Sequence, residues 1–218
     1  MRRVNLFHSV VAASAVVVLA AGCGAGEGSS AAEFAGRAGQ GVHLDYDPLA
    51  TPADAVAQGE LIVRGTLVDV TDGVTFRGAP AEGADRSART FATLVIEVDS
   101  VVKGGAAKGD RVYVLTYKST AVSSRELADL NRRPKLVAVL DDITDWTPSA
   151  GTEVVRPSAM PAGATLYMAF PDGLWLQGSA DREMHGITSE PDQLAPAWGR
   201  VRTVDQYAVA VEKAAKPG

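Results

Sequence analysis

Residues 91–104, FATLVIEVDSVVKG, alternate apolar and polar side chains over most of their length. With the two-residue period of an extended chain, the apolar positions fall on one face and the polar positions on the other. The apolar face consists of Ala92, Leu94, Ile96, Val98 and Val102, and the polar face of Thr93, Glu97, Asp99 and Lys103. The pattern predicts a long, half-buried β-strand, so the fold must supply partner strands and a core on one side of it.

Five further runs are rich in β-branched and aromatic residues and are bounded by turn residues. They are residues 60–70, 111–120, 135–140, 164–170 and 173–178. The last two flank Pro171-Asp172-Gly173, which predicts a hairpin turn. Six turn-separated strands favour an antiparallel barrel or sandwich.

Three short helices are expected at the edges of this sheet. Thr51 followed by Pro52 is typical of a helix start. Ser123 with Glu126 and Thr203 with Gln206 have the spacing of capping boxes. The last helix carries an apolar stripe at i, i+3, i+4 and i+7, which predicts packing on the core; the stripe consists of Val204, Tyr207, Ala208 and Val211.

The segments GELIVRGTLVDV, VIEVDSVVKG and GDRVYVLT, taken in order, resemble the OB-type barrel of netrin-like and TIMP-like domains. The resemblance covers residues 59–120 and implies a mainly β fold: an OB-like antiparallel small barrel of five to six strands, with a short N-terminal helix and an amphipathic C-terminal helix. The chain lacks the disulfide cysteines of the TIMP-like family, including the one that chelates a target's metal. The resemblance therefore implies the barrel and not protease inhibition.

The N-terminus predicts where the protein resides. Arg2 and Arg3 precede an apolar run that is too short to cross a bilayer, and small residues follow it, as in a secretory signal peptide. Ala20-Ala21-Gly22-Cys23 resembles the lipobox of bacterial lipoproteins, which implies cleavage before Cys23 and attachment of acyl chains such as palmitate to that residue. Several acyl chains make anchoring stable. We expect a lipoprotein on the outer face of the cell membrane.

The domain organisation follows from this interpretation. Residues 1–22 are the signal peptide, residues 23–42 are the lipidated N-terminus with a flexible Gly-, Ala- and Ser-rich tether, and residues 43–216 form one globular β-rich domain. Loss of Arg2 and Arg3 changes the net charge from −5 to −7. An acidic chain is a poor partner both for nucleic acid and for an anionic membrane surface, so the membrane contact is expected to come from the lipid alone.

The sequence offers little catalytic chemistry. The mature chain has two histidines, His43 and His185, with no second histidine at a metal-ligand spacing and no free cysteine once Cys23 is lipidated. No Gly-x-Ser-x-Gly motif accompanies them. We expect no cofactor and no metal centre of the histidine or cysteine type.

The best candidates for a binding surface are in long loops. Asp141, Asp142 and Asp145 form an acidic cluster after a predicted strand, which is the wrong context for a diphosphate-binding helix but leaves weak calcium binding open. Trp146 and Trp198 also lie in long loops and are candidates either for this surface or for the core, whereas Trp175, on a strand, is expected in the core.

Two functions remain open at this stage. The first is a non-catalytic binding or assembly module whose ligand is an envelope protein or a glycan. The second is a cell-envelope hydrolase that uses two carboxylates, which would have to lie about 5–10 Å apart in a cleft, one of them with a raised pKa.

Overall fold

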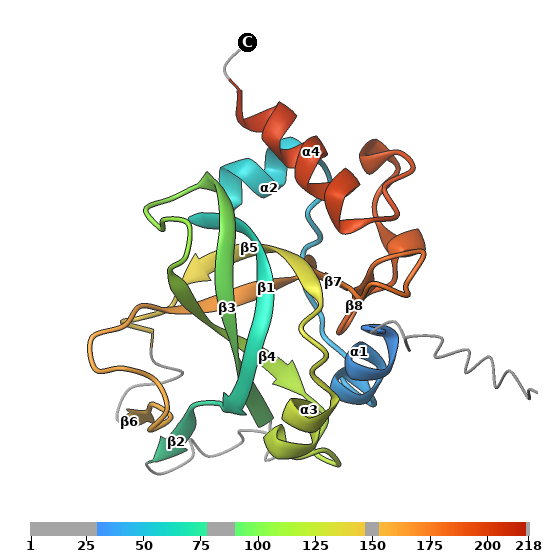
Figure 1. Cartoon of the computed structure of the whole chain (residues 1–218). Helices are drawn as coiled ribbons and strands as arrows, with labels where there is room; N and C mark the ends of the chain where they lie inside the picture. Colours follow the sequence, from blue (N-terminus) through green and yellow to red (C-terminus); the bar gives the residue numbers. More distant parts are fainter. Residues whose placement is uncertain (1–29, 78–89, 147–152, 217–218) are drawn as a thin grey trace, which may run out of the picture.

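The computed structural model describes residues 30–77, 90–146 and 153–216 (Figure 1). The four α-helices of these ranges are α1 (Ala32–Gly39), α2 (Pro52–Gln58), α3 (Ser124–Leu130) and α4 (Val204–Ala215). The strands are β1 (Leu61–Asp72), β2 (Thr75–Arg77), β3 (Thr90–Lys103), β4 (Arg111–Lys118), β5 (Lys135–Asp142), β6 (Glu153–Val155), β7 (Leu166–Gln177) and β8 (His185–Gly186). Short 3-10 turns lie at Pro191–Gln193 and Pro196–Trp198.

Five strands close a small barrel in the order β4-β3-β1-β5-β7, and β7 returns to β4. All neighbours are antiparallel except the closing pair, in which Tyr113–Leu115 of β4 run parallel to Leu166–Met168 of β7. The helix α3 lies between β4 and β5 in the chain. This is an OB-like barrel with peripheral helices, and the fold class expected from the sequence is confirmed.

The predicted hairpin at Pro171-Asp172-Gly173 is wrong. The two runs on either side form one strand, β7, which keeps β5 as its partner throughout. Leu140 pairs with Ala169 and Ala138 pairs with Leu174, so the residues between them bulge out of the ladder. A bulge turns a strand and re-aims its side chains, and here it buries Asp172, a residue that is only 5% exposed.

The wall formed by β5 and β7 has a core on each face. Leu136, Ala138 and Leu140 of β5 face the barrel interior, while Val137 and Val139 face an outer core under α2 and α4. The predicted inward face of β3 is confirmed at Ala92, Leu94, Ile96 and Val98, which lie in the barrel interior. The predicted exposed face is wrong at its start, because Thr93 is fully buried. Val102 instead packs against the outer core, because the β1–β3 register shifts before it.

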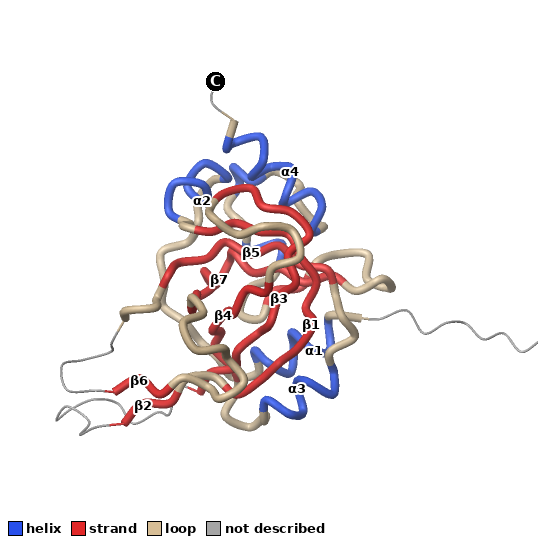
Figure 2. Tube along the Cα trace, turned by 60° about the vertical axis from the view of Figure 1, so that its left-hand side comes forward, coloured by secondary structure: helices blue, strands red, loops and turns tan. Residues whose placement is uncertain are grey.

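The capping signals located the helices correctly. Thr51 accepts a hydrogen bond from the backbone N–H of Asp54, and both expected capping boxes, at Ser123 and Thr203, are formed. The apolar stripe of α4 is buried in the outer core as expected. In Figure 2, α2 and α4 lie together over one end of the barrel, and α3 lies with α1 toward the other end.

The predicted tether is wrong for its C-terminal half; its first residues, 23–29, lie outside the described residues. Ala32–Gly39 form α1, and Phe34 and Ala38 are buried in the barrel core. Gly39 approaches the residue that follows β8 so closely that an added Cβ would lie 1.7 Å from the carbonyl oxygen of Ile187. The domain therefore begins about a dozen residues earlier than expected.

The carboxylate of Asp181 holds the start of α1 in place. It accepts hydrogen bonds from Ser30 Oγ at 2.7 Å, from the N–H of Ala31 at 2.6 Å and from the N–H of Gly178 at 2.8 Å. Burial acts to raise the pKa of Asp181, but these hydrogen bonds, with His185 at 3.9 Å, outweigh it and lower the pKa. These hydrogen bonds fix the position of Ser30 relative to the barrel.

Candidate functional site

A two-stranded ribbon joins the two longest loops of the barrel. Residues Thr75–Arg77 of β2, in the β1–β3 connection, pair antiparallel with Glu153–Val155 of β6, in the β5–β7 connection. In OB folds these two connections flank the ligand-binding face of the barrel. The ribbon rests on a third apolar cluster, which includes Val74, Phe91, Leu115, Ile143, Met160 and Leu166.

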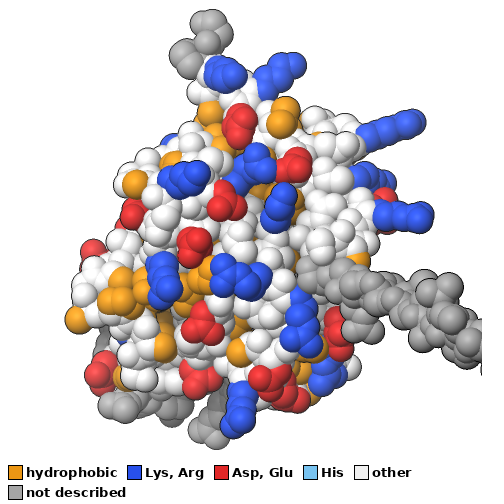
Figure 3. Space-filling view, viewed as in Figure 1, with side chains coloured by type: hydrophobic (Ala, Val, Ile, Leu, Met, Phe, Trp, Pro, Cys, Tyr) orange, Lys and Arg blue, Asp and Glu red, His pale blue; other side chains and the backbone are white. Residues whose placement is uncertain are grey.

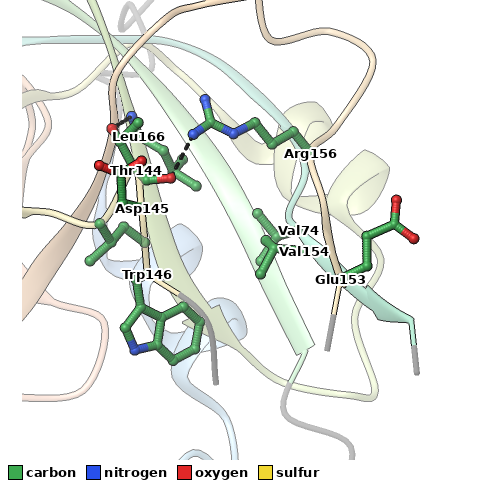
Figure 4. A pocket seen from close by; sticks show the side chains of 9 residues that line it. Val74, Thr144, Asp145, Trp146, Glu153, Val154, Arg156 and Leu166 are labelled. Carbon is green, nitrogen blue, oxygen red and sulfur yellow. Dashed lines mark hydrogen bonds between the residues drawn. The ribbon is translucent and has the colours of Figure 1, made fainter. Parts of the chain in front are cut away.

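A cavity of about 300 Å³, open to solvent, lies beside the ribbon. Its lining residues are Val74, Ile143, Thr144, Asp145, Trp146, Glu153, Val154, Arg156 and Leu166. The loop Thr144–Trp146 forms one wall, and Val74 with β6 and Arg156 forms the opposite wall (Figure 4). This volume is at the lower end of the range for small-molecule sites, so the cavity suits one side chain or one small ligand group.

Hydrogen bonds between and within the walls hold the cavity open. The guanidinium of Arg156 donates to the carbonyl oxygen of Thr144 at 2.8 Å (Figure 4) and to that of Ala164 at 2.9 Å. The hydroxyl of Thr144 accepts the N–H of Leu166 at 3.2 Å, and the N–H of Ile143 donates to the Leu166 carbonyl at 2.9 Å. Arg156 therefore braces the β5–β7 connection, and the site is formed before any ligand arrives.

A second hollow of about 240 Å³ adjoins the ribbon on the other side of Arg156. It is lined by Thr71, Asp72, Gly73, Thr75, Val155, Arg156, Pro157, Ser158 and Ala159. The ribbon thus separates two side-chain-sized recesses.

The structure separates the two candidate tryptophans. Trp146 is 41% exposed and forms part of the cavity wall. Trp198 is 4% exposed and is packed in the outer core, so its place in the candidate binding surface is wrong. Its indole stacks on Tyr207 with ring centroids 4.4 Å apart and donates to the carbonyl oxygen of Leu49 at 2.6 Å. Trp175 is fully buried, as expected.

The three candidate aspartates do not converge on one point. Asp145 lines the cavity. Asp141 and Asp142 end β5, where the N–H of Asp142 donates to Glu60 Oε2 at 2.7 Å and its carboxylate accepts the N–H of Thr144 at 2.8 Å. Within the described ranges, no three His, Cys, Asp or Glu side chains are grouped so that they could hold a metal ion.

The pKa of Asp141 is raised, first by partial burial and then by the neighbouring charges of Glu60 and Asp142. Asp141 is not among the residues that line the cavity or the second hollow. The carboxyl group with the raised pKa therefore lies outside the ribbon cavity.

Sequence reasoning missed Arg156, Glu153 and Val74. The signal for β6 was the short β-branched run Glu153-Val154-Val155, which lies in a segment interpreted as loop. A three-residue strand is too short for its periodicity to stand out, so only its pairing with β2 makes it recognisable.

A second unforeseen group surrounds Asp172 in the bulge of β7. Its Oδ2 accepts the N–H of Leu49 at 2.8 Å, and its backbone carbonyl accepts Trp175 Nε1 at 2.7 Å and the Tyr207 hydroxyl at 3.3 Å. Its Oδ1 is buried and finds no hydrogen-bond partner among the described residues. Burial raises the pKa of Asp172, against the opposing effect of its backbone hydrogen bonds.

The surface and the comparisons add little to this geometry. On the face in Figure 3, acidic and basic side chains are interspersed, so charge alone marks no binding area there.

No protein-family model matches the sequence, and no curated protein is significantly similar to it. In the part of the chain that the structure describes, no helix is both long and apolar enough to cross a membrane. The site has to be interpreted from its own chemistry.

Proposed function

We propose that the protein is a lipoprotein anchored by Cys23 to the outer face of the cell membrane, and that its barrel is a non-catalytic binding module. The observation that carries the binding role is the braced cavity beside the β2–β6 ribbon, with the exposed indole of Trp146 in its wall. Tryptophan is a frequent anchor of binding surfaces. A preformed recess also loses little conformational entropy when it is filled.

The position of α1 supports an outward-facing site. The helix α1 and the ribbon lie on opposite sides of the barrel in two views turned by 60° (Figures 1 and 2). Seven peptide units separate Cys23 from Ser30, and covalent geometry limits their span to about 25 Å. An anchor on Cys23 would therefore hold the α1 side near the membrane and present the ribbon away from it.

The hydrolase alternative gains no support from the cavity. It requires a carboxyl group of raised pKa in a cleft. Among the described residues, the carboxyl groups whose pKa is raised by burial are those of Asp141 and Asp172, and neither lines the ribbon cavity. We therefore retain the binding module as the proposed function.

The anchor is tested by Cys23→Ala. We expect this variant to lose metabolic labelling with an acyl chain, and the protein to remain unprocessed or to be released from the membrane. The reason is that the chain has no other cysteine thiol that could carry the lipid. Ser29→Ala, six residues downstream, is the matched control and should be labelled normally. Cys23→Ala protein that is still processed, membrane-bound and labelled would refute the anchor.

The binding site is tested by photo-crosslinking in native cells. A benzoyl-phenylalanine in place of Trp146 should give a discrete crosslinked product. The same residue in place of Val209, which is 60% exposed on α4, should not give that product. Equal products from both positions, or none from position 146, would remove the ribbon cavity as the binding site.

A further inference from the structure

We propose that one face of the domain docks on the phospholipid surface that holds the lipid of Cys23, with the exposed arginines of that face paired to lipid phosphates. The face, called here the anchor face, consists of residues 30–33, 178–184 and 200–202. This inference rests on the proposed lipid anchor and adds a protein contact to it. Two features carry it: the short chain between Cys23 and Ser30, and the guanidinium groups beside Ser30.

The chain between the lipid and the domain is short because Ser30 is held to the barrel. The carboxylate of Asp181, whose side chain is 6% exposed, accepts hydrogen bonds from Ser30 Oγ and from the N–H of Ala31. Seven peptide units then lead back to Cys23, and they span at most about 25 Å. The domain cannot move farther from its lipid unless these hydrogen bonds break and α1 leaves the barrel.

So short a connection keeps the anchor face close to the lipid headgroups. A site tethered over such a distance has an effective concentration in the millimolar range or above, so contacts that are weak on their own are sufficient for docking. The helix α1 contacts β8, and both lie on the side of the barrel opposite the ribbon (Figure 1). The anchor face is therefore the part of the domain that meets the membrane.

Two exposed arginines lie close to Ser30. Arg182 directly follows Asp181, and the backbone carbonyl of Arg202 accepts the N–H of Met184 at 2.7 Å. Neither arginine forms an ion pair with any residue that the structure describes. A guanidinium group presents a planar fork of N–H donors that matches a phosphate group. Basic side chains protrude on the right-hand side of Figure 3, where the loops around β8 lie in the same view.

The carboxylates of the anchor face do not cancel its arginines. The charge of Asp181 is taken up by its hydrogen bonds and by His185 at 3.9 Å. Glu33 and Glu183 are exposed and stand against three exposed arginines, at positions 182, 200 and 202. The expectation that the lipid alone contacts the membrane used the charge of the whole chain. The anchor face is less acidic than that average, and the short chain to Cys23 brings this face to the headgroups.

The test uses the full lipidated chain, labelled with ¹⁵N, in nanodiscs of phosphatidylcholine and phosphatidylglycerol that contain a gadolinium-chelating lipid. The paramagnetic lipid broadens the amide signals of residues close to the membrane. We expect the signals of Ser30 and Arg182 to be broadened strongly and those of Thr75 and Val155, in the ribbon, to be retained. The intensities give the ratio of docked to undocked domain.

A longer connection should weaken docking without touching the domain. An insertion of about twenty Gly and Ser residues after Gly28 should lower the ratio of docked to undocked domain roughly sevenfold, because effective concentration falls as about the −3/2 power of tether length. Unchanged amide positions elsewhere in the spectrum would show that the fold is intact.

The variant Arg182→Gln/Arg202→Gln should lower the same ratio about fivefold for each arginine lost, and added salt should act in the same direction. The matched control is Lys108→Gln/Arg111→Gln, which removes two exposed basic side chains at the β3–β4 turn, away from α1 (Figure 1). This control should leave the ratio unchanged.

Equal broadening of the Ser30 and ribbon signals, an unchanged ratio after the insertion, or the same ratio for the two double variants would overturn the inference. In each of these cases, acyl label on Cys23 would leave the proposed anchor standing. If the native protein carries no acyl label in cells, the anchor and the docked face fail together.

Discussion

Replacing Trp198 by alanine is expected to lower the free energy of unfolding by about 3–5 kcal/mol, the range for a fully buried aromatic side chain. The indole is 4% exposed, stacks on Tyr207, and donates to the carbonyl of Leu49 at 2.6 Å. Alanine removes the packing and leaves a buried carbonyl with one donor fewer. Denaturant unfolding followed by circular dichroism measures the change.

Trp146→Ala is the matched control for this prediction. The ring is 41% exposed at a cavity wall, so its loss should cost less than about 1 kcal/mol. If Trp198→Ala fails to fold, Trp198→Phe keeps most of the apolar contact and should cost about 1–2 kcal/mol for the lost hydrogen bond. Similar small losses for both alanine variants would place Trp198 at the surface and contradict the structure.

Asp172→Asn is expected to gain stability relative to the native protein as the pH rises above about 4, the ordinary pKa of an aspartate. Burial raises the pKa of Asp172 above the ordinary value of about 3.9 that it has in the unfolded chain. Between the two pKa values the unfolded state releases its proton first, so the free energy of unfolding of the native protein falls as the pH rises. Below both pKa values the carboxyl group is protonated in the folded and in the unfolded state, so its contribution to the free energy of unfolding does not change with pH.

The asparagine variant keeps an oxygen for the N–H of Leu49, carries no charge and so lacks this pH dependence. Asp172→Ala leaves that N–H without its partner and should be about 1–3 kcal/mol less stable than Asp172→Asn at every pH. Comparing the variants with the native protein at each pH cancels the titration of all other groups. A stability difference between Asp172→Asn and native protein that does not change with pH would refute a raised pKa.

Local patterns in the sequence predicted much of the fold. The inward positions of residues 92–98 and the capping residues Thr51, Ser123 and Thr203 are set by neighbours in the chain, so a pattern alone locates them. The predicted turn at Pro171-Asp172-Gly173 failed because β5 pairs with the chain on both sides of it. Long-range pairing overrode a strong local signal.

The candidate site was only partly foreseeable. Asp145 was selected as a member of the acidic cluster and Trp146 as a tryptophan in a long loop, and both line the cavity. Trp198 was also selected as a tryptophan in a long loop and is buried, because a lone aromatic residue in a loop carries no periodicity that would reveal its surroundings. The helix α1 did have a signal: Ala31, Phe34, Ala35 and Ala38 follow the helical period within a segment whose composition suggested a tether.

The wall formed by β5 and β7 also determines how the protein unfolds. Its two faces support two different cores, with Leu136 and Leu176 on the inside and Val137 and Trp175 on the outside. Since the same backbone carries both sets, melting either core removes the support of the other. The barrel and the helices packed on it are therefore expected to unfold together, as one cooperative unit, on heating or during proteolysis.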